Sequence, residues 1–201
     1  SDGGDSSDVA SDLSSGVSQI FSTNSAFAAL KEDGSVITWG EKEDGGDSSD
    51  AASDLGSGVS KIFSTQRAFA ALKDDGSVVT WGNDKYGSNS SNVASDLSSG
   101  VSQIFSSNRA FAALKDDGSV VTWEGSDDYG GDSSSVDLSS GVSQIFSTDR
   151  AFAALKDDGS VVTWGKSNRG GDSSDVASDL SSGVVGMANP FTNDIYQSSA
   201  G

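Results

Sequence analysis

The chain has 201 residues with a formal net charge of −18, because 30 Asp and Glu outnumber 12 Lys and Arg. Such a charge repels nucleic acid and anionic membranes, and no apolar run approaches the roughly 20 residues that span a bilayer. The absence of Cys and His excludes disulfides and thiolate chemistry and removes the commonest general base and metal ligand.

The dominant feature of the chain is an internal repeat. Its four Trp residues fall at positions 39, 81, 123 and 164, at spacings of 42, 42 and 41 residues. The repeats start near residues 3, 45, 87 and 130, and a partial fifth starts at 170. Repetition at such a period is typical of propellers and solenoids. We therefore expect one repeat domain over residues 1–187 and a non-repeat tail over residues 188–201, which holds the only Pro.

The first predicted element of a repeat is the short segment Val9–Leu13. Its periodic apolar residues favour a short outer strand, but its Ser, Asp and Ala residues are also compatible with a helical turn. The fourth repeat shortens this segment to Ser135–Leu138. A segment that tolerates deletion is expected at the periphery of the fold.

The next elements are a strand at Val17–Ser22 and a hairpin over residues 26–39. An Asp-Gly pair between two apolar runs, here Asp33-Gly34, is the strongest short-range hairpin signal. A two-residue turn there would place Trp39 opposite Ala28. Both faces of this hairpin are largely apolar, so we expect it to be covered by sheets on both sides.

The order of these elements resembles the repeat of the regulator of chromosome condensation family over about residues 3–184. The matching residues of the first repeat are Val9, Leu13, Val17, Ile20, Leu30, Asp33, Gly34, Val36, Thr38, Trp39 and Gly40. The resemblance implies an all-β protein, a β-propeller with four-stranded blades. It implies a fold and not an activity, because nothing here matches the exchange-factor surface of the family. The number of blades that close a ring stays open, and a β-solenoid with one repeat per coil is the alternative fold.

Acidic residues recur at the hairpin turns, which share one end of the blades with the DLSSG loops. The carboxylates in question are Asp33, Asp75, Asp117 and Asp158. Hard oxygen ligands suit Ca²⁺, so this rim is a candidate for weak calcium binding, the only cofactor that we consider. The alternative is a solvated rim of residues that are simply good turn formers.

Basic residues precede three of the hairpins, at Arg67, Arg109 and Arg150, where the first repeat has Ser25. They are expected at the opposite end of the blades, with the GGDSSD loops, as a candidate rim for a partner or ligand. The alternative is that they pair with loop carboxylates such as Asp47 or Asp132, and exposed pairs contribute only about 0–1 kcal/mol each.

No catalytic constellation is visible, since the many Ser residues have no His to activate them. The four Trp residues are expected in the core. We expect a non-enzymatic binding or structural module, part of a larger bacterial surface or secreted protein. Its expected partner is a protein or a glycan, and self-association through incomplete blades is included. The alternatives are a lectin with one site per blade and a glycan-active enzyme that uses the turn carboxylates.

Overall fold

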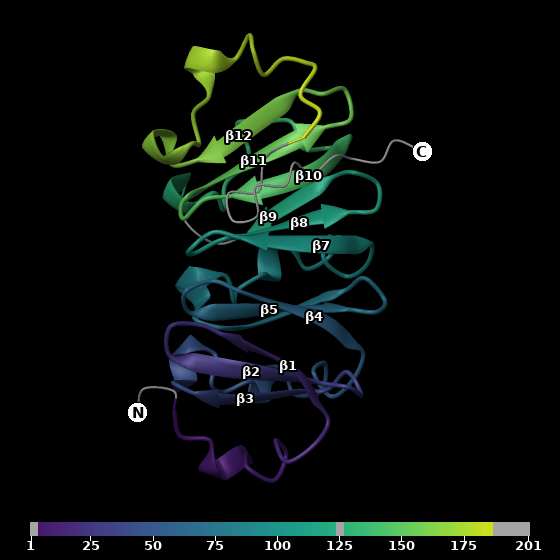
Figure 1. The fold of residues 1–201 in the computed structure, drawn as a ribbon, viewed down its shortest axis with the longest axis vertical. Helices are drawn as coiled ribbons and strands as arrows, with labels where there is room; N and C mark the ends of the chain where they lie inside the picture. The colour runs from purple at the N-terminus through teal and green to yellow at the C-terminus, as the bar shows by residue number, and fades with distance from the viewer. Residues whose placement is uncertain (1–3, 124–126, 187–201) are drawn as a thin grey trace.

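The computed structural model describes residues 4–123 and 127–186, which form four antiparallel sheets of three strands each (Figure 1). The strands are β1 (Val17–Ser22), β2 (Ala26–Lys31), β3 (Val36–Gly40), β4 (Val59–Ser64), β5 (Ala68–Lys73), β6 (Val78–Gly82), β7 (Val101–Ser106), β8 (Phe111–Lys115), β9 (Val120–Trp123), β10 (Val142–Ser147), β11 (Ala151–Lys156) and β12 (Val161–Gly165). Each sheet has the order of its strands in the chain, so each repeat forms one sheet. Within the described ranges, no helix is long and apolar enough to cross a membrane.

The four sheets follow one another along the long axis of the molecule (Figure 1). The first strands of neighbouring sheets, β1, β4, β7 and β10, contact one another in turn. The first and the last sheet lie at opposite ends of the molecule, so the blades do not close into a ring.

The hairpin turns are one residue longer than predicted. Gly34 N donates to Lys31 O at 3.0 Å, and Lys31 N donates to Ser35 O at 2.9 Å, which makes a three-residue loop. Gly34 closes it at φ +76°, a left-handed conformation that glycine adopts without strain.

The longer loop shifts the pairing of the two arms by one residue. Trp39 therefore lies opposite Phe27, and the predicted pairing with Ala28 is wrong. The two rings stack with their centroids 5.2 Å apart, and the other three repeats have the same stacked pair.

The predicted outer strand is also wrong, since the segment forms short 3-10 turns. These turns are η1 (Ser7–Val9), η3 (Ser49–Ala51), η5 (Ser91–Val93) and η8 (Ser174–Val176). Local bonds hold them, as where Asp47 Oδ1 accepts from Ser49 N at 2.9 Å, and such bonds compete with strand pairing. The segment still covers the outer edge of the preceding sheet, where Leu55 O accepts from Val36 N at 3.0 Å.

The core lies between neighbouring sheets. In each interface, a face with small Ala side chains, the small face of one sheet, packs against a face with Ile, Phe and Trp, the large face of the next sheet. The first cluster contains Ala26, Ala28, Leu30 and Val36 of the first repeat with Ala51, Leu55, Val59, Ile62, Phe69, Ala71 and Trp81 of the second. Two further clusters repeat this arrangement along the chain. Trp81, Trp123 and Trp164 are at most 5% exposed, which confirms their predicted place in the core. Trp39 is only partly buried, so the prediction is wrong for the first repeat, whose sheet has no described repeat packed before it.

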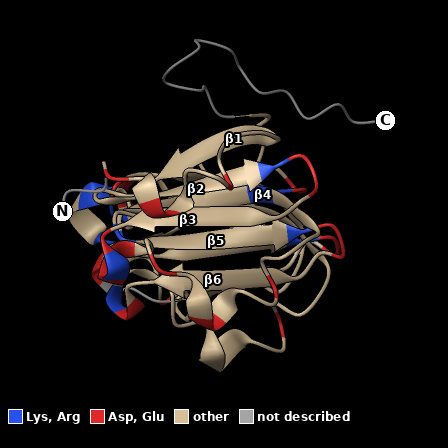
Figure 2. Ribbon diagram, turned by 90° about the horizontal axis from the view of Figure 1, so that it is seen from below, with Lys and Arg blue, Asp and Glu red and all other residues tan. Residues whose placement is uncertain are grey.

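The two ends of the sheets carry different charged groups (Figure 2). One end holds the Asp-Gly turns together with the Lys residues that close the second strands. The other end holds the Arg residues and four further 3-10 turns. These turns are η2 (Lys42–Asp44), η4 (Asp84–Tyr86), η6 (Asp127–Tyr129) and η7 (Ser167–Arg169).

Candidate binding surface

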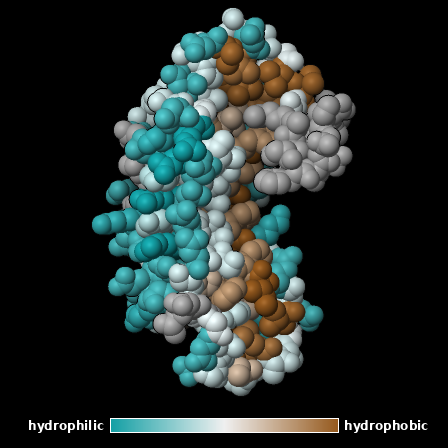
Figure 3. All heavy atoms as spheres, turned by 60° about the vertical axis from the view of Figure 1, so that its left-hand side comes forward, coloured by the Kyte–Doolittle hydropathy of each residue, from teal (hydrophilic) through white to brown (hydrophobic). Residues whose placement is uncertain are grey.

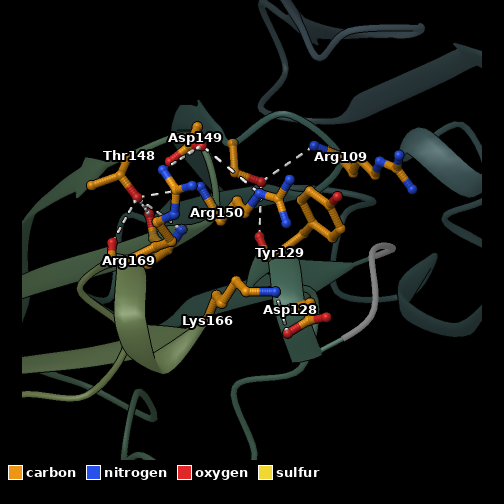
Figure 4. A network of polar contacts seen from close by, with 10 residues as sticks. Arg109, Asp128, Tyr129, Thr148, Asp149, Arg150, Lys166 and Arg169 are labelled. Carbon is orange, nitrogen blue, oxygen red and sulfur yellow. Dashed lines mark hydrogen bonds and ion pairs between the residues drawn. The ribbon is translucent and has the colours of Figure 1, made fainter.

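Three Arg and two Tyr residues form a continuous stack along the Arg end of the sheets, which we call the Arg–Tyr column. Its members in order are Arg67, Tyr86, Arg109, Tyr129 and Arg150. The guanidinium carbons of Arg67 and Arg109 lie 5.3 and 4.6 Å from the Tyr86 ring centroid. Those of Arg109 and Arg150 lie 4.6 and 4.9 Å from the Tyr129 centroid (Figure 4). These are distances at which the ring quadrupole attracts a cation.

Hydroxyl groups fix the tyrosines of the column relative to the arginines. Thr65 Oγ1 donates to Tyr86 O at 2.8 Å and accepts from Ala68 N at 3.1 Å. Ser107 Oγ makes the corresponding bonds to Tyr129 O and Ala110 N, at 2.8 and 3.1 Å. Each 3-10 turn is thereby tied to the start of the hairpin that carries the Arg.

Backbone bonds between repeats set the spacing along the column. Gln66 N donates to Asn108 O at 3.1 Å, and Asn108 N donates to Asp149 O at 3.0 Å. Each of these residues directly precedes an Arg of the column. The backbone that carries the stack is therefore held by hydrogen bonds between neighbouring repeats.

Carboxylates stand at the two ends of the column. At one end Arg67 lies 3.8 Å from Asp44, which is 5% exposed. At the other end Asp149 lies 3.8 Å from Arg150 and 3.6 Å from Arg169 (Figure 4). Exposure of the arginines limits each such pair to about 0–1 kcal/mol.

The predicted partner Asp47 does not pair with the column. It accepts from Lys42 at 2.7 Å, and this bond, with bonds from Ser49, holds the pKa of Asp47 well below its ordinary value. Asp132 accepts a bond from Ser134 N at 2.8 Å within its own turn.

Two side-chain nitrogens of the column have unused hydrogen-bonding capacity. The Nε atoms of Arg109 and Arg150 are buried and have no hydrogen-bond acceptor in the structure. Although the whole molecule is strongly acidic, Arg109 has no ion pair within the described part of the chain. The middle of the column therefore holds a guanidinium that no carboxylate of residues 4–123 or 127–186 pairs with.

The turn carboxylates that we predicted as a cation-binding rim each bond within their own turn. Asp33 Oδ1 accepts from Ser35 Oγ at 2.6 Å and from Ser35 N at 3.0 Å, and these bonds lower its pKa. Asp75, Asp117 and Asp158 have the same bonds and the same direction of shift. Across residues 4–123 and 127–186, no group of three or more acidic, His or Cys residues is placed to hold a metal ion. Weak calcium binding stays a prediction.

Tyr86 and Tyr129 were not singled out by sequence, although a signal was present. Both stand directly before a glycine, Gly87 and Gly130, in a connection where the repeats differ from one another. The equivalent residue is Asp44 in the first repeat and Arg169 in the fourth. The repeat is otherwise nearly constant, so the variation at this position and at the Arg position was a sign that both could serve a function specific to this chain.

Comparison with known proteins supports the fold. No family model matches the sequence, and no curated protein matches it. Among solved structures, human WBSCR16 is similar with 20% identity and a TM-score of 0.50, covering 79% of this chain and 50% of that chain. Prp20p from Saccharomyces cerevisiae is similar with 17% identity and a TM-score of 0.51, covering 74% of this chain and 45% of that one. The Kap60-bound yeast RCC1 (Prp20) gives 13% identity, a TM-score of 0.51, and coverage of 76% and 44%.

These structures confirm the predicted fold. The chain has the all-β propeller architecture of regulator of chromosome condensation repeats, and it spans about half the length of the structures that it matches. At these identities the likeness extends to the fold and to nothing finer.

Proposed function

We propose that this chain is a non-enzymatic repeat module that binds a protein partner through the Arg–Tyr column. The observation that carries this proposal is the unbroken stack from Arg67 to Arg150, in which every neighbouring Arg and Tyr lie within 5.3 Å. Propellers of this fold include proteins whose solved structures concern binding to Gsp1p and histones or to Kap60.

The residue types of the column support a role in protein recognition. Arg and Tyr, with Trp, dominate the binding energy of protein interfaces. Their stacking in the free chain reduces the entropy that a partner must overcome on binding. The column also occupies the positions at which the repeats differ, whereas the residues between the sheets are nearly constant.

The chemistry of the column favours a partner segment that carries carboxylates. The guanidinium group presents several donors in a fork that suits a carboxylate. Arg109 is flanked by two rings, and no acid of residues 4–123 or 127–186 lies within ion-pair distance of it, so a carboxylate of the partner suits its guanidinium.

The pKa shifts give the alternative of a glycan-active enzyme no support. A glycan-active enzyme needs one carboxyl group with a raised pKa as its general acid. In the described part of the chain, every Asp whose pKa departs clearly from its ordinary value is shifted downward. A place in a larger secreted or surface protein of a bacterium belongs to the proposal as well, supported by the Cys-free, acidic composition. A lectin with one site per repeat is the alternative, supported by the repeated loops.

The test is selection of peptides from a displayed library against the full chain, followed by affinity measurements. We expect enrichment of acidic peptides, and at least about a tenfold loss of affinity in Arg109→Ser, which installs the residue of the first repeat. Lys61→Gln removes one positive charge from β4, where other repeats have Gln, and is the matched control. If both variants lost the same affinity for the peptides, the loss would be a general effect of charge, and the column would be rejected as the binding site.

A second candidate function, self-association through the open ends, is favoured by one observation. Ile20 on β1 is 59% exposed, whereas its equivalents Ile62, Ile104 and Ile145 are at most 3% exposed. The first sheet therefore shows to solvent an apolar face that the other sheets bury.

A further inference from the structure

We propose that two copies of this chain associate head to tail, with exchange of an identical edge segment. In this arrangement the first sheet of one copy docks on the fourth sheet of another and recreates the interface that already joins successive repeats. The inference rests on the second candidate function above and specifies its geometry and its partner surface.

The head of the chain is the large face of the first sheet. In the second repeat this face, with Ile62, Phe69 and Trp81, packs into a core cluster with the first repeat. Its counterparts Ile20, Phe27 and Trp39 have no preceding repeat within the described chain, and all three are more exposed than their equivalents. Figure 3 shows a stripe of apolar surface along one side of the molecule, which reaches the lower end where this sheet lies.

The tail of the chain is the small face of the fourth sheet. Ala153 on β11 is partly exposed, whereas its equivalents Ala28, Ala70 and Ala112 are 0% exposed. The same stripe of apolar surface reaches the upper end of the molecule (Figure 3).

The loop glycines of the repeats have different neighbours at the tail and in the interior of the chain. A Cβ on Gly45, Gly87 or Gly130 would come within 2.5–2.6 Å of the Phe ring of its own repeat. A Cβ on Gly170 would meet nothing within 4 Å, although its φ of +101° matches the +102° of Gly45. The partial fifth repeat therefore presents the loop that receives a Phe and Trp pair, and no described residue fills it.

The two ends are complementary in shape and not self-complementary. Every internal interface joins a face with small Ala residues to a face with Ile, Phe and Trp. The large head fits the Ala-lined tail in the same way, whereas two heads would oppose bulky residues. A head-to-tail contact is heterologous, so it leads to closed rings, of two or more copies, or to open filaments.

Both ends carry the same edge segment, and only one can occupy the docked interface. Residues 3–17 and 170–184 both read GGDSSDVASDLSSGV. The second of these covers the edge of β12, where Leu180 O accepts from Val161 N at 2.8 Å and Val184 N donates to Gly159 O at 3.0 Å. The interior repeats use the same bonds, as between Leu55 O and Val36 N.

Because the sequences are identical, one segment can replace the other without any change in these hydrogen bonds. The gain on association is burial of the large head, and the cost is release of one redundant segment. Exchange of an identical element between copies is a low-cost route to association.

The first test is the molecular mass of the full chain over a concentration series, by sedimentation velocity. We expect the mass to rise with concentration in the wild type. Ile20→Glu should weaken association by about 100-fold or more, because it would bury a carboxylate without a cation. Gln19→Glu adds the same charge next to it and should leave the mass unchanged, because the equivalent Lys61 and Gln103 stay exposed in interior repeats.

The second test is cross-linking, which the absence of natural Cys makes specific. Ile20→Cys chains and Ala153→Cys chains are mixed and treated with a short bis-maleimide. Products that join one chain of each kind support the proposal. Products that join two Ile20→Cys chains, or a wild type that stays monomeric at its solubility limit, overturn it. Ile20→Glu should still bind the acidic peptides selected above, so failure of one proposal leaves the other standing.

Discussion

The first and second repeats have nearly the same residues and different surroundings. Their second strands, β2 and β5, share the sequence AFAALK, and both hairpins stack a Phe on a Trp at 5.2 and 5.1 Å. Yet Phe69 is 0% exposed and Phe27 is not buried, because only the second repeat has a sheet packed against its large face. Burial here is set by the neighbouring repeat and not by the sequence of the repeat itself.

This difference identifies where the stability of the molecule resides. A single sheet has two apolar faces and cannot bury either one alone, so the free energy of folding comes largely from the interfaces between repeats. Substitutions of equivalent residues in the first repeat and in an interior repeat measure those interfaces directly.

The largest effect is expected for Trp123→Ala compared with Trp39→Ala. Trp123 is 4% exposed, and its Nε1 donates to Gly87 O at 3.0 Å. Its removal leaves a cavity and an unpaired carbonyl, and should cost about 3–5 kcal/mol of unfolding free energy. Trp39 is only partly buried, so its removal should cost clearly less. Urea denaturation followed by circular dichroism measures both losses of unfolding free energy. Equal losses would show that a preceding repeat does not contribute to the stabilising effect of the Trp.

An intermediate effect is expected for Gly45→Ala compared with Gly170→Ala. Both glycines have φ near +100°, so both substitutions strain the backbone by about 1–3 kcal/mol. Only Gly45 also has a Phe ring in the way, 2.6 Å from the added Cβ, which should cost about 1–3 kcal/mol more through overpacking. Thermal melts of the two variants isolate the packing contribution, and coinciding curves would contradict the contact between Gly45 and Phe69.

The strands and their order could be predicted because they depend on local pattern. Apolar runs around an Asp-Gly pair define each hairpin, and the repeat period defines the sheets. The register could not be predicted, since an Asp-Gly pair suits both a two-residue turn and the three-residue loop found here. With both faces of the hairpin apolar, a shift by one residue left no polar side chain in the core to reveal the error.

The outer segment and the column show two other limits. The residues of Val9–Leu13 allow a strand or a turn. Local bonds just before this segment, such as the one that Asp5 Oδ1 accepts from Ser7 N, decide for the turn. For the column, the Arg positions were visible in the sequence. The stacking with Tyr86 and Tyr129 depends on how far the connections fold back, which a repeat pattern does not specify.

The smallest effect concerns a feature that should not depend on neighbours at all. In all four repeats the turn Asp accepts two hydrogen bonds from the Ser two residues later. Both lower the pKa of the Asp, and the bond from the Ser hydroxyl has a larger effect than the bond from its N–H. Ser77→Ala removes the hydroxyl bond and should raise the pKa of Asp75 toward its ordinary value, with the other three turns unchanged.

The sign of the linked stability follows from the direction of the shift. A carboxyl whose pKa is lower in the folded state stabilises the fold above its unfolded pKa of about 3.9, and this contribution is lost as the pH falls through the folded value. Ser77→Ala should therefore reduce stability slightly at neutral pH and make no difference in strong acid. Carboxyl NMR titration of the wild type and the variant measures the pKa. A shift that differed between Asp33 and Asp75 would mean that the absent neighbour reaches even the turns, against the purely local origin argued here.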